Sequence, residues 1–525
     1  MAESRVQKSI LNARVNFIFY ILTLAFSFFS RKIFLNNLGN EFLGLVGTLQ
    51  SILGFLNLAE LGVSAAIAFA LYKPLREKEE NKIIDIVSLF GFFYKKIGIF
   101  VLSAAIIVSA FFPLIFRDTP ISSGLVYFSF YAFLFSSLIG YFINYKQILL
   151  SADQKNYVVA IYFQSANVFK IIIQMLLAWK YSNPYIWVAI ELFFGLLYSV
   201  ILNWKINQVY PWLKTTTKNG HTLYKKYSDI FTRTKQIFIH KIKDFILMQS
   251  DQIFIFAFVS LSMVTYYGNY TLITSRIISL FSTTMDSIVA GVGNLVAEGN
   301  QTKIVSVFWE LMAFRYFLAG SIVFCCYYLI DSFISLWIGN GYILDRSIVI
   351  LLIVYIFIML TRGTVDIFNN AYGLFADTWS AWTEAVLNIG ITLSTVRYLG
   401  INGILLGKII STFLIIVLWK PYYLFSQGFH TSYRLYWMKT FPLLLAFTIS
   451  CIIFHFVNNL LLMLFPEFNL TFASWLAYAA CLGILFSFFY GCLLLCFSHG
   501  ARSLLHRIPF YGRLKLRFCR FPYEK

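Results

Sequence analysis

The chain has 525 residues, of which 59% are hydrophobic and only 12% are charged. So few polar side chains cannot cover an apolar core of this size, which excludes an ordinary water-soluble protein. The formal net charge of +19 would suit a nucleic-acid partner, but the basic residues lie at the ends of apolar segments instead of in one compact domain. We interpret them as groups that face anionic membrane lipids, and we expect no nucleic-acid partner.

Fourteen apolar stretches are long enough to cross a bilayer, whose hydrocarbon core of about 30 Å requires roughly 20 apolar residues per helix. They predict an all-α integral membrane protein with about 14 transmembrane helices. The predicted spans are 12–34, 42–71, 88–116, 125–150, 157–179, 185–204, 236–260, 265–294, 304–330, 347–375, 378–398, 401–424, 440–465 and 473–497. Little chain is left for a soluble domain, so we expect the protein to work within the membrane.

The connections between the predicted spans alternate in charge. Lys and Arg gather in the even-numbered connections and in the two tails, and they are scarce in the odd-numbered connections. Cytoplasmic loops carry this excess of positive charge in polytopic membrane proteins. The pattern predicts a multi-pass protein of the cell inner membrane with both termini in the cytoplasm.

One connection is much longer and more basic than the others. It covers residues 205–235, contains seven Lys and Arg residues together with Pro211 and Gly220, and predicts a cytoplasmic linker. The linker separates an N-terminal lobe, 1–204 with helices 1–6, from a C-terminal lobe, 236–424 with helices 7–12. Residues 425–525 then hold helices 13 and 14 and a basic cytoplasmic tail.

Several cations fall inside predicted spans, where a charge exposed to lipid costs about 2.5–3.5 kcal/mol on insertion scales. Four of them, near the middle of their spans, are Lys170, Arg276, Arg315 and Arg362, and Lys408 lies within the twelfth span. As a set they predict a cationic interior that attracts phosphate, and we expect the first four to bind the substrate. For any one of them, a structural ion pair or a side chain that snorkels to the interface is an equally good interpretation.

Acidic residues also occur within the spans. We interpret Glu60, Asp251 and Asp366 as candidates for ion coupling by H⁺ or Na⁺, and Glu191 as one of several candidate partners for the cations. Arg362 and Asp366 are one helical turn apart, so a local i,i+4 ion pair is the structural alternative for both.

The sequence contains no pattern that predicts an enzyme. HExxH, GxxxxGK[ST] and GxSxG strings are absent, and the six histidines are scattered without ligand spacing. We therefore expect no catalytic residues, no metal site and no cofactor, and we expect transport by a secondary mechanism.

Two strings carry a resemblance to a known family. The segment NNLGNEFLGLVGTLQSILGFLNLAELGVSAAIAFALYKPL, Asn36–Leu75, with its FLG and AELG motifs, resembles the amino-terminal signature of bacterial polysaccharide flippases. These are the O-antigen, capsule and teichoic-acid exporters of the multidrug/oligosaccharidyl-lipid/polysaccharide superfamily. DQIFIFAFVSLSMVTYYGNYTLI, from Asp251, resembles the start of that family's second lobe, and GNLVAEGN, from Gly293, resembles the turn that follows.

The resemblance covers essentially the whole chain and implies both a fold and a substrate. It implies two six-helix lobes in a V-shaped bundle around a central cavity, with two extra C-terminal helices packed outside. The implied substrate is a polyprenyl-diphosphate-linked oligosaccharide that moves from the cytoplasmic to the periplasmic leaflet for lipopolysaccharide or other surface polysaccharide. Arginines and lysines that line the cavity are typical of the family.

Two other functions stay open. A cation-coupled multidrug exporter would have the same architecture, but such carriers usually bind cations through acidic residues in the N-terminal lobe, and the first predicted span contains no Asp or Glu. A polytopic polysaccharide polymerase or acyltransferase would present catalytic residues in a sizeable outer loop. The longest periplasmic connection is the short segment 331–346, which disfavours such an enzyme.

The charge distribution makes a direct prediction about topology. Reporter fusions after Lys82, Lys226 and Lys525 should behave as cytoplasmic, and a fusion within 331–346 should behave as periplasmic, because the basic connections stay inside. Paired phosphatase and fluorescent-protein fusions measure this. A periplasmic carboxyl terminus would contradict the count of fourteen helices.

Overall fold

A computed structural model describes residues 5–57, 63–153, 155–217, 219–227, 235–374, 376–464 and 471–507. Within these ranges the regular structure is helical and contains no strand. The chain divides into two compact units, Met1–Gly268 and Asn269–Lys525. The predicted division into lobes and linker at 205–235 is a different one and stays a prediction.

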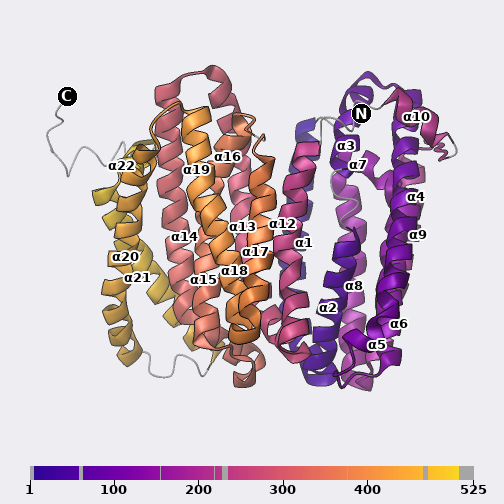
Figure 1. Ribbon diagram of the computed structural model, residues 1–525, viewed down its shortest axis with the longest axis horizontal. Coiled ribbons are helices and arrows are strands. Elements are labelled where there is room, and N and C mark those ends of the chain that lie inside the picture. The colour runs from indigo at the N-terminus through magenta and orange to yellow at the C-terminus, as the bar shows by residue number, and fades with distance from the viewer. Residues whose placement is uncertain are drawn as a thin grey trace. The chain divides into compact units, whose positions relative to one another are not determined.

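The N-terminal unit is a bundle of long helices and short connecting ones (Figure 1). Its helices are α1 (Arg5–Leu38), α2 (Asn40–Leu56), α3 (Val63–Glu77), α4 (Glu80–Ala110), α5 (Phe112–Ile115), α6 (Ser123–Phe142), α7 (Gln147–Ala152), α8 (Asn156–Tyr181), α9 (Pro184–Val209), α10 (Gly220–Lys226) and α12 (Lys235–Phe258). Helix α8 packs against α1 and α9, and α6 packs against α4 and α9. Helix α2 packs against α12.

The C-terminal unit continues from α13 (Leu261–Glu298), which begins just before the boundary between the units. Its other helices are α14 (Gln301–Ile338), α15 (Arg346–Thr361), α16 (Gly363–Ala371), α17 (Thr378–Leu399), α18 (Ile401–Thr412), α19 (Lys420–Tyr423), α20 (Tyr433–Leu464), α21 (Phe472–Phe497) and α22 (His499–Arg507). Helix α14 contacts α15, α21 and α22, and α17 contacts α18. The stretches Phe413–Trp419 and Leu424–Gly428 are π-helical.

Each of the fourteen predicted spans corresponds to a helix or to consecutive helices, which confirms the predicted all-α membrane protein. In the part of the chain that the structure describes, ten segments are long and apolar enough to cross a membrane. The other four predicted spans correspond to α2 with α3, to α12, to α13 and to α17, which are shorter or more polar. Span 42–71 is occupied by α2 and α3, and residues 58–62 between them lie outside the described residues.

Polar side chains begin several of the helices where the sequence offers them. The side chains of Ser122, Asn183 and Asn300 accept hydrogen bonds from backbone N–H groups in the first turns of α6, α9 and α14. Thr471 and Ser474 form a reciprocal capping box at the start of α21. Such caps pair backbone N–H groups that have no partner in the first turn of a helix. Leaving these N–H groups unpaired costs free energy.

Two glycines allow α18 to approach α17 closely. A Cβ at Gly407 would lie 2.9 Å from the carbonyl oxygen of Asn388 and 2.3 Å from Oγ1 of Thr392. A Cβ at Gly403 would lie 2.8 Å from the carbonyl carbon of Thr395. The small-xxx-small pair therefore sits at a helix contact, as its spacing predicts.

This contact predicts the effect of filling it. Gly407→Ala should destabilise the protein by about 1–3 kcal/mol because its methyl group meets backbone atoms that cannot move aside, and Gly407→Leu should reduce folded protein further. The matched control is Gly390→Ala on α17, where a Cβ meets nothing within 4 Å. Thermal unfolding in detergent compares the variants. Equal midpoints for the two alanine variants would contradict the proposed close contact.

Candidate functional site

Lys170 forms an ion pair within the N-terminal unit. It lies on α8, and its Nζ is 2.7 Å from Oε1 of Glu191 on α9. Gln174, one turn after Lys170, donates through Nε2 to Oε2 of Glu191 and to the carbonyl oxygen of Trp187, both at 3.1 Å. Both carboxylate oxygens of Glu191 are therefore held by α8, which fixes the position of the charge pair.

The pair lines a cavity of 510 Å³ among α6, α7, α8 and α9, whose wall is mostly apolar with a group of polar side chains. Its polar side chains include the amides and the hydroxyl group of Asn144, Gln147, Asn167 and Tyr198. Asn144 is itself oriented, since its Oδ1 accepts hydrogen bonds from Oγ of Ser199 at 2.8 Å and Nδ2 of Asn203 at 2.9 Å. A fixed cation with amide and hydroxyl groups around it can bind an anionic group that carries sugar hydroxyls.

The acids predicted for ion coupling are in different situations. Asp251, on α12, is only 5% exposed, and its Oδ2 accepts a hydrogen bond of 2.8 Å from the hydroxyl of Tyr267. Glu60 lies outside the described residues. Asp366 belongs to an ion pair in the C-terminal unit, whereas Asp251 lies in the N-terminal unit.

Arg315 is buried in the C-terminal unit, at 6% exposure, where α15 ends and α16 begins. Its Nη1 donates to the carbonyl oxygen of Leu360 at 3.3 Å, and its guanidinium carbon lies 5.3 Å from the ring centroid of Phe281. A Cβ at Gly363 would be only 2.3 Å from Nη1, so the glycine makes room for the guanidinium. These contacts give Arg315 a structural role at the junction, and its role in substrate binding stays a prediction.

Arg362 and Asp366 form the local ion pair that their spacing suggests. Nε of Arg362 lies 3.1 Å from Oδ2 of Asp366, and both side chains are partly exposed. The guanidinium of Arg315 lies beside Gly363, the residue that follows Arg362 in the chain. Arg276, on α13, is half-buried in the same unit, whereas Lys170 belongs to the other unit.

Other ionisable groups are buried in the C-terminal unit, among them Lys408 and Asp377. Lys408 is 4% exposed, and its Nζ lies 5.0 Å from the ring centroid of Tyr355. The carboxylate of Asp377 is held by Nζ of Lys420 at 2.8 Å and by Nε1 of Trp419 at 3.0 Å. The Asp377 cluster was not predicted from the sequence. The signals for it are an Asp directly before the predicted span 378–398 and a Lys inside the predicted span 401–424.

These long apolar helices define an all-α polytopic membrane protein. Comparison with protein-family models and with curated proteins finds no match to this sequence. Among solved structures, the fold is similar to the lipid II flippase MurJ in an inward closed conformation. That match has a TM-score of 0.65 and 17% identity, and it covers 94% of this chain and 100% of that chain.

The fold is also similar to multidrug resistance transporters of the MATE family, which belongs to the MOP superfamily. An inward-facing structure matches with a TM-score of 0.56 and 15% identity, over 77% of this chain and 93% of that chain. An outward-facing structure matches with a TM-score of 0.50 and 14% identity, over 80% and 96%. The chain thus has the fold that MurJ and the MATE transporters share.

The Lys170–Glu191 pair can be tested without substrate, by a double-mutant cycle on the free energy of unfolding. Lys170→Gln should destabilise the protein by about 1–3 kcal/mol, because it removes a charge-assisted hydrogen bond and leaves the Glu191 carboxylate half-satisfied. Lys170→Gln combined with Glu191→Gln should recover most of this loss. Thermal unfolding measures the cycle, with Lys180→Gln on exposed α8 surface as the control. A double variant no more stable than the single one would argue against the pair.

Proposed function

We propose that the protein is a secondary transporter of the flippase type in the bacterial inner membrane. Its substrate is a polyprenyl-diphosphate-linked oligosaccharide, which it moves from the cytoplasmic to the periplasmic leaflet for surface polysaccharide assembly. The observation that carries this proposal is the fold match to a lipid II flippase over 94% of this chain and all of that chain. The FLG and AELG motifs of Asn36–Leu75 support the polysaccharide class of substrate.

The cavity beside Lys170 suits the headgroup of such a substrate. A diphosphate with attached sugars cannot cross hydrocarbon unaided, because its charges and hydroxyls would lose their hydrogen bonds to water. Lys170 supplies a cation, and Asn144, Gln147 and Asn167 supply amide groups in the same cavity. Arg276, Arg315 and Arg362 are the further cations that we propose as substrate-binding residues in the C-terminal unit.

The membrane potential favours the proposed direction of transport. Two negative charges that move outward across an inside-negative membrane gain roughly 4–5 kcal/mol per 100 mV. Exchange for H⁺ or Na⁺ would add to this driving force. Asp251 is the candidate for such coupling that is buried within the described residues, and Glu60 and Asp366 complete the proposed set.

A multidrug exporter is the second candidate, and the fold similarity to MATE transporters favours it. However, that match covers only 77% of this chain, compared with 94% for the flippase. Helix α1 also contains no Asp or Glu that would bind a coupling cation. Ion-driven drug efflux by the purified protein, without rescue of surface glycan in cells, would favour the exporter.

The proposal predicts that neutral replacement of the cations abolishes export. Lys170→Gln, Arg276→Gln, Arg315→Gln and Arg362→Gln should each reach the membrane but fail to restore surface glycan in a flippase-null strain, because headgroup binding is lost. Arg434→Gln, at an exposed residue in the first turn of α20, is the control that keeps activity. Full activity in all four variants, at normal abundance, would remove the cationic-cavity assignment.

The Arg362–Asp366 pair sharpens this experiment. If Arg362 only neutralises Asp366, Arg362→Gln combined with Asp366→Asn restores export, since no unpaired carboxylate remains. If Arg362 binds the substrate, as we propose, the double variant is stable but inactive. A stable and active double variant would therefore assign Arg362 to structure alone.

A further inference from the structure

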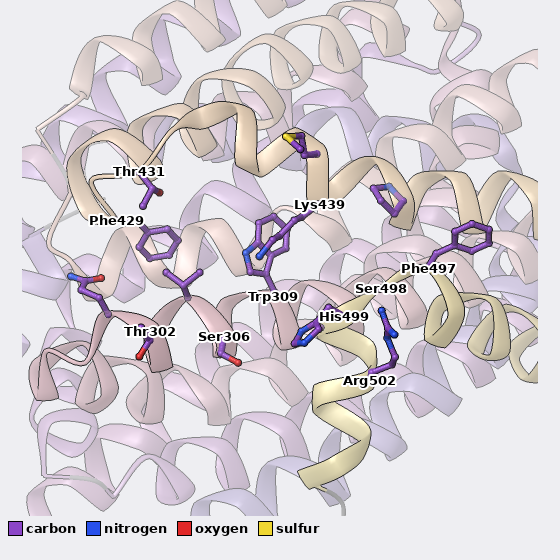
Figure 2. Close-up of a pocket in the computed structure, with 15 residues that line it drawn as sticks. Thr302, Ser306, Trp309, Phe429, Thr431, Lys439, Phe497, Ser498, His499 and Arg502 are labelled. Carbon is purple, nitrogen blue, oxygen red and sulfur yellow. The ribbon is translucent and has the colours of Figure 1, made fainter. Parts of the chain in front are cut away.

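A second cavity, of 670 Å³, lies in the C-terminal unit among α14, α20 and α22 (Figure 2). It is formed where α14 and α20 begin and where α21 ends and continues into α22. The charge distribution of the sequence predicts all of these ends to be cytoplasmic. The cavity therefore lies where the protein meets the headgroups of the inner leaflet.

The ionisable side chains that line this cavity are basic. They are Lys439 of α20 and His499 and Arg502 of α22, and no Asp or Glu lines it among the described residues. Lys439 and Arg502 are exposed and form no salt bridge with any carboxylate that the structure describes. The Nζ of Lys439 lies 5.5 Å from the ring centroid of Trp309, so the ammonium group is positioned above the floor of the cavity (Figure 2). Unpaired cations around a concavity create a site for an anion.

The floor and one wall are fixed by close packing of α22 on α14. A Cβ at Gly500 would lie 2.3 Å from the carbonyl oxygen of Trp309, so the glycine lets α22 begin against α14. Nε of Arg507 lies 2.9 Å from Oε2 of Glu310, which anchors the other end of α22. The carboxylate of Glu310, which follows Trp309 in the chain, is therefore already paired with a cation. Trp309 is 6% exposed, and its indole N–H has no acceptor within the described part of the chain.

Apolar side chains border the basic ones. Met438 and Phe497 line the cavity and are 71% and 41% exposed, and Phe441 on the same helix as Met438 is 62% exposed. A soluble anion would make no favourable contact with these exposed apolar side chains. A lipid places its phosphate among the cations and its acyl chains along the exposed apolar side chains, and so uses both features.

We propose that this cavity binds the headgroup of an anionic phospholipid of the inner leaflet. The lipid is a resident ligand that holds α14, α20 and α22 together, and it is distinct from the transported substrate. The inference does not depend on the proposed flippase function, because the site and its test involve neither the cavity beside Lys170 nor any transport step.

The test uses purified full-length protein in detergent. Phosphatidylglycerol, phosphatidylcholine and inorganic phosphate are titrated in parallel, and the thermal unfolding midpoint and the number of lipids retained in native mass spectrometry are recorded. Phosphatidylglycerol should raise the midpoint and stay bound, whereas phosphatidylcholine and phosphate should do neither. Phosphate as effective as phosphatidylglycerol would overturn the lipid assignment, since it would show a site for a free anion.

Variants test whether phosphatidylglycerol binds in this cavity. Each basic residue near a membrane surface contributes a factor of about five to the binding of anionic lipid, so Lys439→Gln with Arg502→Gln should weaken phosphatidylglycerol binding about 25-fold. Both side chains are exposed and unpaired, so the variant should fold normally. Lys439→Arg should retain binding.

The charge-matched control is Lys303→Gln with Arg434→Gln, which removes two charges at the same helix ends but outside the cavity. It should bind phosphatidylglycerol as the unmodified protein does. An unchanged affinity in the Lys439/Arg502 variant, or an equal loss in the control, would overturn the proposed site.

Discussion

A charge inside a membrane has to find its counter-charge or its hydrogen-bond partner within the protein, because the surrounding hydrocarbon offers none. This requirement connects the helices of each unit. Lys170 on α8 meets Glu191 on α9, and Gln174 completes the pair, so the two helices are joined by three polar contacts. In the C-terminal unit, Arg315 of α14 donates to a backbone carbonyl at the junction of α15 and α16.

The helices could be predicted because the hydropathy of a membrane span depends only on the composition of about twenty consecutive residues. The neighbouring helix does not have to be known. The Arg362–Asp366 pair could also be predicted, since an i,i+4 spacing brings two side chains together on any helix. The glycine spacing of Gly403 and Gly407 likewise indicated a close helix contact, although it did not show that α17 is the neighbour.

Contacts between helices could not be predicted in the same way. Lys170 and Glu191 are 21 residues apart, and the rotation of α8 against α9 decides whether they meet. The sequence offered Glu191 only as one of several partners. The acceptor of Arg315 is a backbone carbonyl, which has no signal in the sequence, and Asn144 and Gln174 were missed because a neutral amide within a span resembles any tolerated polar residue.

The pairing of Lys170 also explains how the chain accommodates an ammonium group within a membrane-spanning helix. An unpaired ammonium in this position would carry a large desolvation cost, whereas the pair with Glu191 is neutral as a whole. An ammonium has three donors, and Glu191 occupies one of them. On the proposed function, a phosphate of the substrate would bind the remaining donors, while Gln174 continues to hold the other oxygen of the carboxylate. On the proposed function, the ion pair with Glu191 would stay in place while the anion binds and leaves, so the contact that stabilises the fold would also keep binding reversible.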